Sequence, residues 1–250
     1  MQRLRIILCL VGVLGVGLML AVALVDLPDF GATRHPYGDR AVAAALENET
    51  ANAVASVTFD QRAVDTLGEE FILFTAAVGG LLLLRRTDEE MRQSELEQHG
   101  EGEAVFAVVR LAGLLMLPVT LTAGGYTVLH GHISVGGGFQ GGVLLASGVH
   151  VAYLAGDLAV LERLRDVRVF DVAEAAGVAA IVAMGLAAMA SGSAFLTNVL
   201  PHGRLTELLS GGTVPLLNIA TGTAVASALV VLLAKFLEQA LVLDSGPGRR

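Results

Sequence analysis

Charged residues and cysteine are both scarce in this chain. Asp, Glu, Lys and Arg together make up 16% of the 250 residues, whereas 54% are hydrophobic. A soluble domain usually carries about a quarter charged residues, so this balance is typical of a membrane protein. The single cysteine, Cys9, excludes a disulfide framework and a cysteine metal cluster.

Several chemical signatures are missing as well. The 16 Lys and Arg residues form no basic stripe that would neutralise phosphates, which argues against nucleic acid as a partner. The sequence contains no P-loop, zinc pattern, CxxC pair or Ser-His-Asp order. We therefore expect no enzymatic activity from this chain by itself, and no cofactor.

Long apolar runs are the main feature that is present. A run of about 20 apolar residues is needed to cross the hydrocarbon core of a bilayer. In the apolar runs of this chain, apolar and small residues alternate with a helical period, and no strand-like alternation persists. The sequence thus predicts an all-α, polytopic membrane protein with six transmembrane helices. The six runs cover residues 6–25, 67–84, 104–129, 138–155, 172–190 and 214–237.

The basic residues between these runs predict the orientation. If the N-terminus faces the cytoplasm, 11 of the 16 basic residues lie in inner segments, four lie in outer segments, and Arg110 lies within a span. This bias follows the positive-inside rule, so both termini are expected to face the cytoplasm. A basic start and the triplet Ala21-Val22-Ala23 would also suit a cleaved signal peptide, but the apolar core is longer than that of most signal peptides.

Two connecting segments have features of their own. Residues 26–63 form a long outer loop, in which residues 39–55 could be a short interfacial helix. The stretch RRTDEEMRQSELEQHGEGE is strongly charged and indicates a boundary between modules. We expect a two-helix module over residues 1–90, a charged linker over 91–103 and a four-helix domain over 104–250.

The stretch HGHISVGGGFQGG, residues 130–142, contains two glycine patterns. Residues 136–141 fit the G-x-G-x-x-G of dinucleotide-binding loops, but that loop needs a preceding strand and a surrounding sheet, which the hydropathy does not predict. Gly138 and Gly142 fit the G-x-x-x-G of packed membrane helices. These glycines could let backbones approach closely, or could let the fourth helix start unwound and offer carbonyls to a cation.

Three histidines lie in or near this stretch. His130 and His132 precede the glycines at the outer end of the third span, and two imidazoles alone are too few for a metal site. They could make interfacial hydrogen bonds or relay protons. His150 falls within the fourth span, where an ionisable group usually faces protein or a water-filled path.

Acidic residues stand at the start of two spans. Asp65 and Glu69 are four residues apart and share a helix face, where they could bind a cation or pass a proton. The competing interpretation is a capping box formed by Thr66 and Glu69. Asp171 and Glu174 repeat the capping pattern at the fifth span.

The start of the last span carries its own signals. Thr213 and Pro215 suit the first residues of a helix, and Asn218 places a polar group in its first turns. A chain that served only as an anchor would not need such polar groups in several spans.

Two segments resemble a known family. Residues 131–142 are similar to the G-H-x-x-P-G-G-G-F-x-G-G signature of the B-type subunit of the multisubunit Na+/H+ antiporters (Mrp or Mnh type), and residues 210–237 are similar to its last helix. Val135 stands where that family usually has proline. The resemblance covers about residue 104 to the C-terminus. The matching signature residues are Gly131, His132, Gly136, Gly137, Gly138, Phe139, Gly141 and Gly142.

The first part of the chain resembles a different component of the same antiporters. Residues 60–69, DQRAVDTLGE, are similar to the D-x-R-x-x-D-T-x-G-E segment in the C-terminal region of the large A-type subunit. The same module occurs as the E-type subunit of membrane-bound hydrogenases. The chain therefore resembles a fusion of two neighbouring subunits.

The resemblance implies a non-catalytic membrane subunit of a multisubunit Na+/H+ antiporter, or of a redox-driven relative such as a membrane-bound hydrogenase, in the cytoplasmic membrane of a prokaryote. Its partners would be the lipid bilayer, the other antiporter subunits and, in a redox-driven complex, a hydrogenase-type module. The ligands would be the transported Na+ and H+. A purely structural scaffold is the alternative. The candidate ion- or proton-handling residues are Asp65, Glu69, His132, His150 and Asn218.

Overall fold

A computed structural model describes residues 2–25, 27, 35–84, 107–155 and 168–244. No regular element in these ranges is a strand, and the predicted all-α class is confirmed. The charged linker expected over residues 91–103 lies outside the described residues. The helices are α1 (Gln2–Val25), α2 (Pro36–Glu47), α3 (Ala53–Ser56), the π-helical turn η1 (Val57–Gln61), α4 (Ala63–Leu83), α6 (Ala107–Leu129), α7 (Gly138–Leu154), α9 (Arg168–Ala190) and α10 (Val214–Asp244).

Five of these helices are long and apolar enough to cross a membrane. The fourth predicted run is also a helix, α7, but its 17 residues extend only about 26 Å, which is less than a typical hydrocarbon core. A sixth span through α7 therefore stays a prediction. The five candidate spans are Leu4–Val25, Ala63–Leu83, Val108–Leu129, Arg168–Ala190 and Val214–Phe236.

The chain divides into two compact units, residues 1–40 and residues 41–250, with the boundary inside α2. In the first unit, α1 is apolar on every side and none of its apolar span is buried. A helix that is hydrophobic all round is suited to lipid or to a partner helix rather than to a soluble surface.

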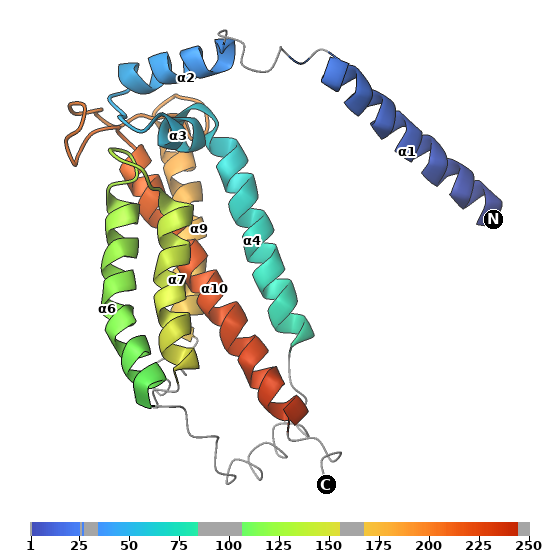
Figure 1. Ribbon diagram of the computed structural model, residues 1–250. Coiled ribbons are helices and arrows are strands. Elements are labelled where there is room, and N and C mark those ends of the chain that lie inside the picture. Colours follow the sequence, from blue (N-terminus) through green and yellow to red (C-terminus); the bar gives the residue numbers. More distant parts are fainter. Residues whose placement is uncertain (1, 26, 28–34, 85–106, 156–167, 245–250) are drawn as a thin grey trace. The chain divides into compact units, whose positions relative to one another are not determined.

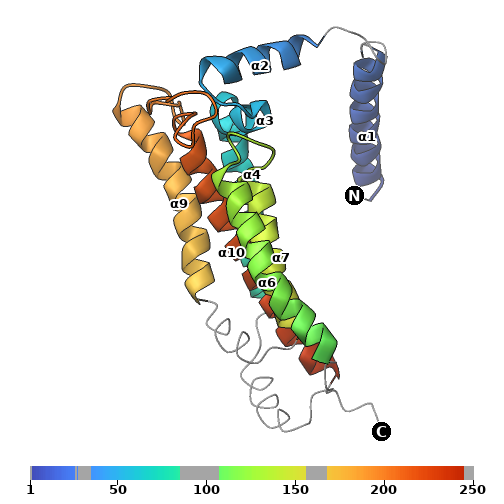
Figure 2. The same ribbon diagram turned by 60° about the vertical axis from the view of Figure 1, so that its left-hand side comes forward.

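In the second unit, α4, α6, α7, α9 and α10 run side by side, and α10 is the central helix (Figures 1 and 2). It contacts the other four, and 61% of its apolar span is buried, compared with at most 33% in α4, α6 and α9. Its buried Ala220, Ala224 and Ala228 are spaced by four and so share one face. Small residues on a shared face let neighbouring helices approach closely.

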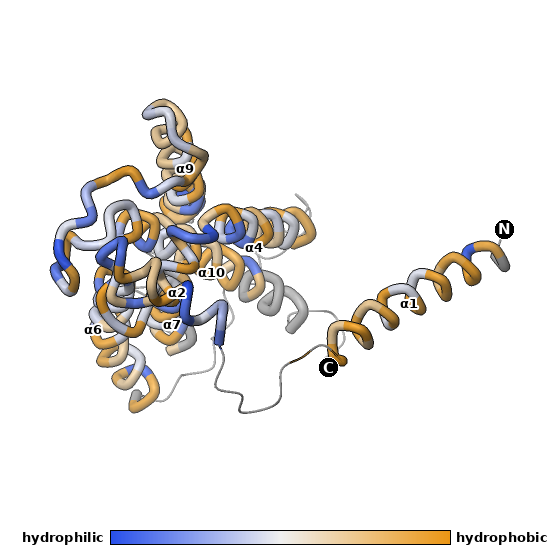
Figure 3. The backbone as a smooth tube through the Cα atoms, turned by 90° about the horizontal axis from the view of Figure 1, so that it is seen from above, coloured by the Kyte–Doolittle hydropathy of each residue, from blue (hydrophilic) through white to orange (hydrophobic). Residues whose placement is uncertain are grey.

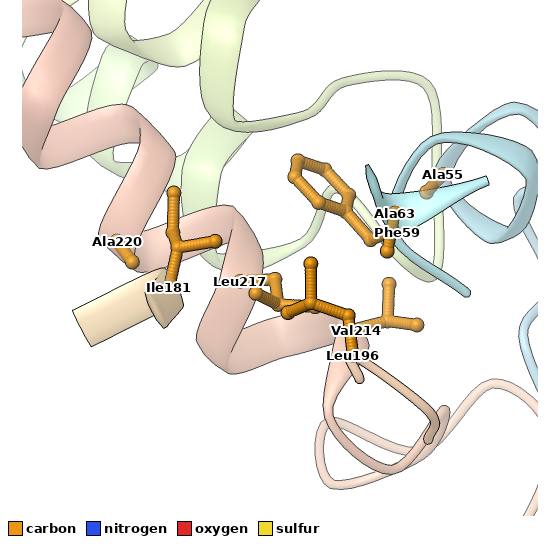
Figure 4. Close-up of a cluster of buried hydrophobic side chains, with 8 residues drawn as sticks. All are labelled: Ala55, Phe59, Ala63, Ile181, Leu196, Val214, Leu217 and Ala220. Atoms are coloured by element: carbon orange, nitrogen blue, oxygen red, sulfur yellow. The ribbon is translucent and has the colours of Figure 1, made fainter. Parts of the chain in front are cut away.

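The connections at one end of this bundle are well packed. We call this end the loop end and define it as residues 48–62, 130–137 and 191–213. Seen from this end, the helices are largely hydrophobic and most hydrophilic residues lie in the connections (Figure 3). A hydrophobic cluster closes the bundle here, and it joins the segment before α4 to α9 and α10 (Figure 4). Its members are Ala55, Phe59, Ala63, Ile181, Leu196, Val214, Leu217 and Ala220.

The outer segment that we expected to hold one interfacial helix over residues 39–55 contains two helices instead. The first, α2, ends at Glu47, and Glu49 then adopts a φ of 53°, which a helix cannot continue. Asn52 starts α3, because its side-chain oxygen accepts hydrogen bonds from the amides of Val54 and Ala55.

Candidate functional site

Residues 130–137, which we call the glycine loop, connect α6 to α7 at the loop end (Figure 1). Gly136 and Gly137 have φ values of 156° and 155°, a region that glycine occupies and other residues avoid. The Gly137 amide donates a hydrogen bond to the Thr127 carbonyl at 3.2 Å, which folds the loop back onto α6. The loop follows a helix, and no described residue forms a strand, so the dinucleotide-binding interpretation has no structural support.

Asn52, in the connection before α3, holds the glycine loop from the N-terminal part of the second unit. Its Nδ2 donates to the carbonyls of Gly131 at 2.7 Å and Ser134 at 2.8 Å, with Gly136 O at 3.4 Å. Its backbone amide donates to the His132 carbonyl at 3.0 Å. Four carbonyls of the loop are therefore bound by Asn52. The sequence reasoning missed Asn52, although an Asn before a short apolar stretch is a recognisable helix cap.

Asn218 of α10 holds the start of α7 from the other side. Its Oδ1 accepts a hydrogen bond from the Gly138 amide at 2.7 Å, and its Nδ2 donates to the Val214 carbonyl at 3.2 Å. The Gly138 amide is one of the N-terminal amides of α7 that have no partner within the helix. Asn218 thus caps α7 from a neighbouring helix, while its proposed ion-handling role stays a prediction. The predicted helix start at Thr213 and Pro215 is confirmed, because α10 begins at Val214.

The glycines of α7 lie against two neighbouring helices. A Cβ atom on Gly138 would lie 2.7 Å from the Asn218 carbonyl oxygen of α10, and one on Gly142 would lie 2.9 Å from the Gly222 carbonyl oxygen. A Cβ atom on Gly141 would lie 2.8 Å from the Val128 nitrogen of α6. No side chain fits in these gaps, so α7 is in backbone contact with α6 and with α10.

His132 is fully buried inside the glycine loop. Its Nε2 lies 3.1 Å from the Leu208 carbonyl oxygen, so this nitrogen carries the hydrogen and donates it. Its Nδ1 is buried and has no hydrogen-bond partner among the described residues. Burial lowers the pKa of His132 below its ordinary value of 6.5, against the opposing effect of the Leu208 and Glu207 carbonyls. His130 is only half-buried and stacks on Tyr126, with ring centroids 4.1 Å apart.

His132 should make the loop end sensitive to acid. The folded protein binds a proton at His132 less readily than the unfolded chain does. The contribution of neutral His132 to the free energy of unfolding is therefore fully present above the ordinary pKa of 6.5 and decreases as the pH falls below it. We expect the thermal midpoint of the purified protein to drop between pH 7.5 and 5.5, and His132→Gln to weaken this dependence. His130→Gln serves as the control and should retain it. The same acid sensitivity in both variants would contradict this account.

His150 lies in α7 and faces α10. Its Nε2 is 3.2 Å from the Leu229 carbonyl oxygen, and with Tyr153 and Leu233 it lines a cavity of about 10 Å³. That volume holds one water at most. The proposed ion- or proton-handling role of His150 stays a prediction.

Asp65 and Glu69 lie on the exposed face of α4. The Arg62 Nη2 is 2.5 Å from the Asp65 Oδ2, and both side chains are more than half exposed, so the ion pair adds little stability. The predicted capping box is wrong. Helix α4 begins at Ala63, directly after η1 and Arg62, so Thr66 lies beyond the cap position and its hydroxyl donates to the Thr58 carbonyl instead.

Two other carboxylates are buried. Glu70 of α4 is 1% exposed and Glu174 of α9 is 4% exposed, and one oxygen of each has no hydrogen-bond partner among the described residues. The predicted capping role of Glu174 is wrong, because α9 begins at Arg168 and places Glu174 in the second turn. The sequence reasoning passed over Glu70. The helical spacing of the sequence could have indicated that Glu70 is buried, because this residue lies on the same face of α4 as three small residues. The buried residues of α4 are Ala63, Thr66, Glu70 and Ala77.

The part of the chain that holds the glycine loop is similar to a known family. The family described as a domain related to the MnhB subunit of Na+/H+ antiporters matches residues 108–231, which include the glycine loop, α7 and most of α10. An uncharacterised protein of Methanocaldococcus jannaschii is 31% identical over 196 residues, which cover 71% of this chain and 74% of that relative.

Two solved structures are similar over nearly the whole chain. A chain of the membrane-bound sulfane sulfur reductase, an archaeal respiratory membrane complex, has a TM-score of 0.67 and 27% identity, covering 94% of this chain and 98% of that one. A chain of the Mrp complex from Dietzia has a TM-score of 0.64 and 22% identity, covering 93% of this chain and 26% of that one, and so shows the fold alone. The chain is thus a multi-pass prokaryotic membrane protein that belongs to the family of subunits related to MnhB of the Na+/H+ antiporters.

Proposed function

We propose that this chain is an integral membrane subunit of a multisubunit cation/proton antiporter, or of a related energy-converting membrane complex, and that it contributes to ion translocation and to assembly. The glycine loop carries the proposal. The residues that resemble the signature of the B-type antiporter subunits are the ones that bring α6, α7 and α10 into backbone contact, and they lie inside the family match. The chain itself performs no covalent chemistry and needs no cofactor; Na+ and H+ are the ligands.

The proposed topology has six spans, with α7 as the short one, and both termini in the cytoplasm. The charge distribution supports it, and so does the alternation of the helices. α4, α7 and α10 lead away from the loop end, whereas α6 and α9 lead towards it (Figure 1). Residues 48–62, 130–137 and 191–213, which the charge rule assigns to the outside, therefore gather at one end of the bundle.

The proposed partners are the other antiporter-like and small membrane subunits of such a complex. The likeness to a chain of a respiratory membrane complex supports the redox-driven alternative, in which a redox module is a further partner. We also propose that residues 1–90 correspond to the module that resembles the large A-type subunit, and residues 104–250 to the B-type domain. This proposal is supported by the likeness in fold between 93% of this chain and one chain of the Mrp complex.

A purely structural scaffold is the second candidate. One observation favours it: the buried side-chain amide of Asn218 and the side-chain amide of Asn52 are used to hold backbone segments together. On this alternative the chain would position the subunits that carry ions, without an ion path of its own.

Neutralising the exposed acidic pair separates the two candidates. In membrane vesicles that contain the whole complex, Asp65→Asn with Glu69→Gln should reduce Na+/H+ exchange by about tenfold, because a carboxylate pair on one helix face would no longer attract cations. Assembly should be unaffected, since both side chains are exposed. Asp39→Asn removes another exposed acid, in the first turn of α2, and should leave exchange as it is. Normal exchange in the double variant would favour the scaffold.

A further inference from the structure

Glu70 and Glu174 come from helices that pack against each other, α4 and α9. Both side chains are buried, and the negative charge of Glu174 acts on Glu70. One oxygen of each carboxylate has no hydrogen-bond partner among the described residues. Two buried, unsatisfied acidic groups on adjacent helices, of which one charge acts on the other, are costly unless something else binds there.

Among the described residues, no basic side chain acts on this pair. The charges that act on Glu70 are those of Glu174 and of Glu69 on its own helix, and the charge that acts on Glu174 is that of Asp171. All of these are acidic. Helix α10 has no ionisable residue between Val214 and Ala234, and Asp60 of η1 accepts a hydrogen bond from Asn48.

The basic residues on the described helices around the pair lie elsewhere. Arg62 binds Asp65 at the start of α4, Arg168 is the first residue of α9, and Lys235 lies near the far end of α10. Within the part of the chain that the structure describes, an ion pair with a basic side chain therefore does not explain the burial of the two carboxylates. A proton shared between them, or a small cation bound by both, would remove the repulsion.

We propose that Glu70 and Glu174 form a site that binds one exchangeable proton, which Na+ can replace, where α4 meets α9. The inference rests on the proposed function, because it assigns an ion-binding step to this chain. It also joins the two predicted modules functionally, since Glu70 lies in residues 1–90 and Glu174 in residues 104–250. A carboxyl group that is protonated inside an apolar bundle and is ionised when Na+ binds exchanges one ion for the other with no net change of charge.

Labelling with dicyclohexylcarbodiimide tests the site in membranes that hold the whole complex. This apolar reagent adds to a protonated carboxyl group in apolar surroundings, and rearrangement leaves the complete reagent attached as an N-acylurea, which peptide mass spectrometry locates. We expect an adduct on Glu70 or Glu174 at pH 6. Adding Na+ or raising the pH should reduce it several-fold, whereas the same concentration of choline should not.

Three variants control the labelling. Glu47→Gln removes an exposed carboxylate at the end of α2 and should leave labelling and Na+ protection unchanged. Glu174→Gln should leave an adduct on Glu70 that Na+ no longer reduces, because a single carboxylate lacks the second ligand. Glu70→Gln should do the same for Glu174. Native electrophoresis confirms that each variant still assembles.

Each result decides the proposal. No adduct on either residue in an assembled complex overturns the proton site, and an adduct that is insensitive to Na+ overturns the exchange. The labelling does not depend on transport. Na+-sensitive labelling together with normal exchange in Glu70→Gln and Glu174→Gln would therefore retain the site and reject the role of this chain in translocation.

Discussion

Gly138→Ala is expected to reduce the amount of assembled complex several-fold and to lower its thermal midpoint. The new Cβ would lie 2.7 Å from the Asn218 carbonyl oxygen and 2.8 Å from the Thr221 Cβ, and neither can retreat, because both belong to the central helix α10. Overpacking of this kind costs about 1–3 kcal/mol. Moving α7 away would also lengthen the 2.7 Å hydrogen bond from the Gly138 amide to Asn218. Native electrophoresis and a thermal melt of the purified complex measure the two effects.

Gly125→Ala is the matched control for this prediction. Gly125 lies in α6, and beyond its chain neighbours and the backbone of its own helix a Cβ atom there would meet no atom within 4 Å. Alanine in a helix loses less backbone entropy than glycine, so this variant should be neutral or more stable by up to about 1 kcal/mol. If Gly138→Ala assembled and melted as Gly125→Ala does, the contact between α7 and α10 would not determine assembly.

Substitutions of Asn52 should destabilise the glycine loop in a graded way. Asn52→Ala removes both the cap of α3 and the donor to Gly131 O and Ser134 O. A carbonyl that loses its partner in a buried position costs about 1–3 kcal/mol, and the lost cap adds about 1 kcal/mol. Limited proteolysis between residues 130 and 137, together with the thermal midpoint, should report the loss.

Two conservative variants separate the two roles of Asn52. Asn52→Ser retains a capping oxygen, but its side chain cannot reach the loop carbonyls. It should therefore destabilise the protein less than Asn52→Ala does, by about 1 kcal/mol, which is the contribution of the cap. Asn52→Asp retains the cap but brings a negative charge towards carbonyl oxygens. Of the three variants, it should therefore be the one in which residues 130–137 are cleaved fastest by protease. Wild-type protection of the loop in Asn52→Ser would show that Asn52 acts only as a helix cap.

The helical architecture could be predicted because it depends on local patterns. A run of about 20 apolar residues must be a helix to satisfy its backbone in a bilayer, so five predicted spans recur as long apolar helices. Thr213 and Pro215 were sufficient to place the start of α10. The glycine pattern indicated close helix packing, although the identity of the neighbouring helices needed the structure.

The polar groups were harder to assign, because their roles depend on distant segments. Glu69 and Glu70 are adjacent and chemically identical, yet Glu69 is exposed and Glu70 is buried. Only the positions of α9 and α10, more than 100 residues further along the chain, decide between them. The partners of Asn52 lie about 80 residues away, and hydropathy contains no information on such pairings.

Apolar length, helical period and charge bias were thus enough to identify a helical membrane protein, and the full glycine signature was enough to indicate its family. Each of these features is a property of a continuous segment, and the bilayer acts on segments. The tertiary structure decided that Asn52 and Asn218 bind the glycine loop and the start of α7, and that Glu70 and Glu174 are buried on packed helices. Burial and hydrogen bonding of a side chain are properties of the packed bundle, so they arise only when the helices meet.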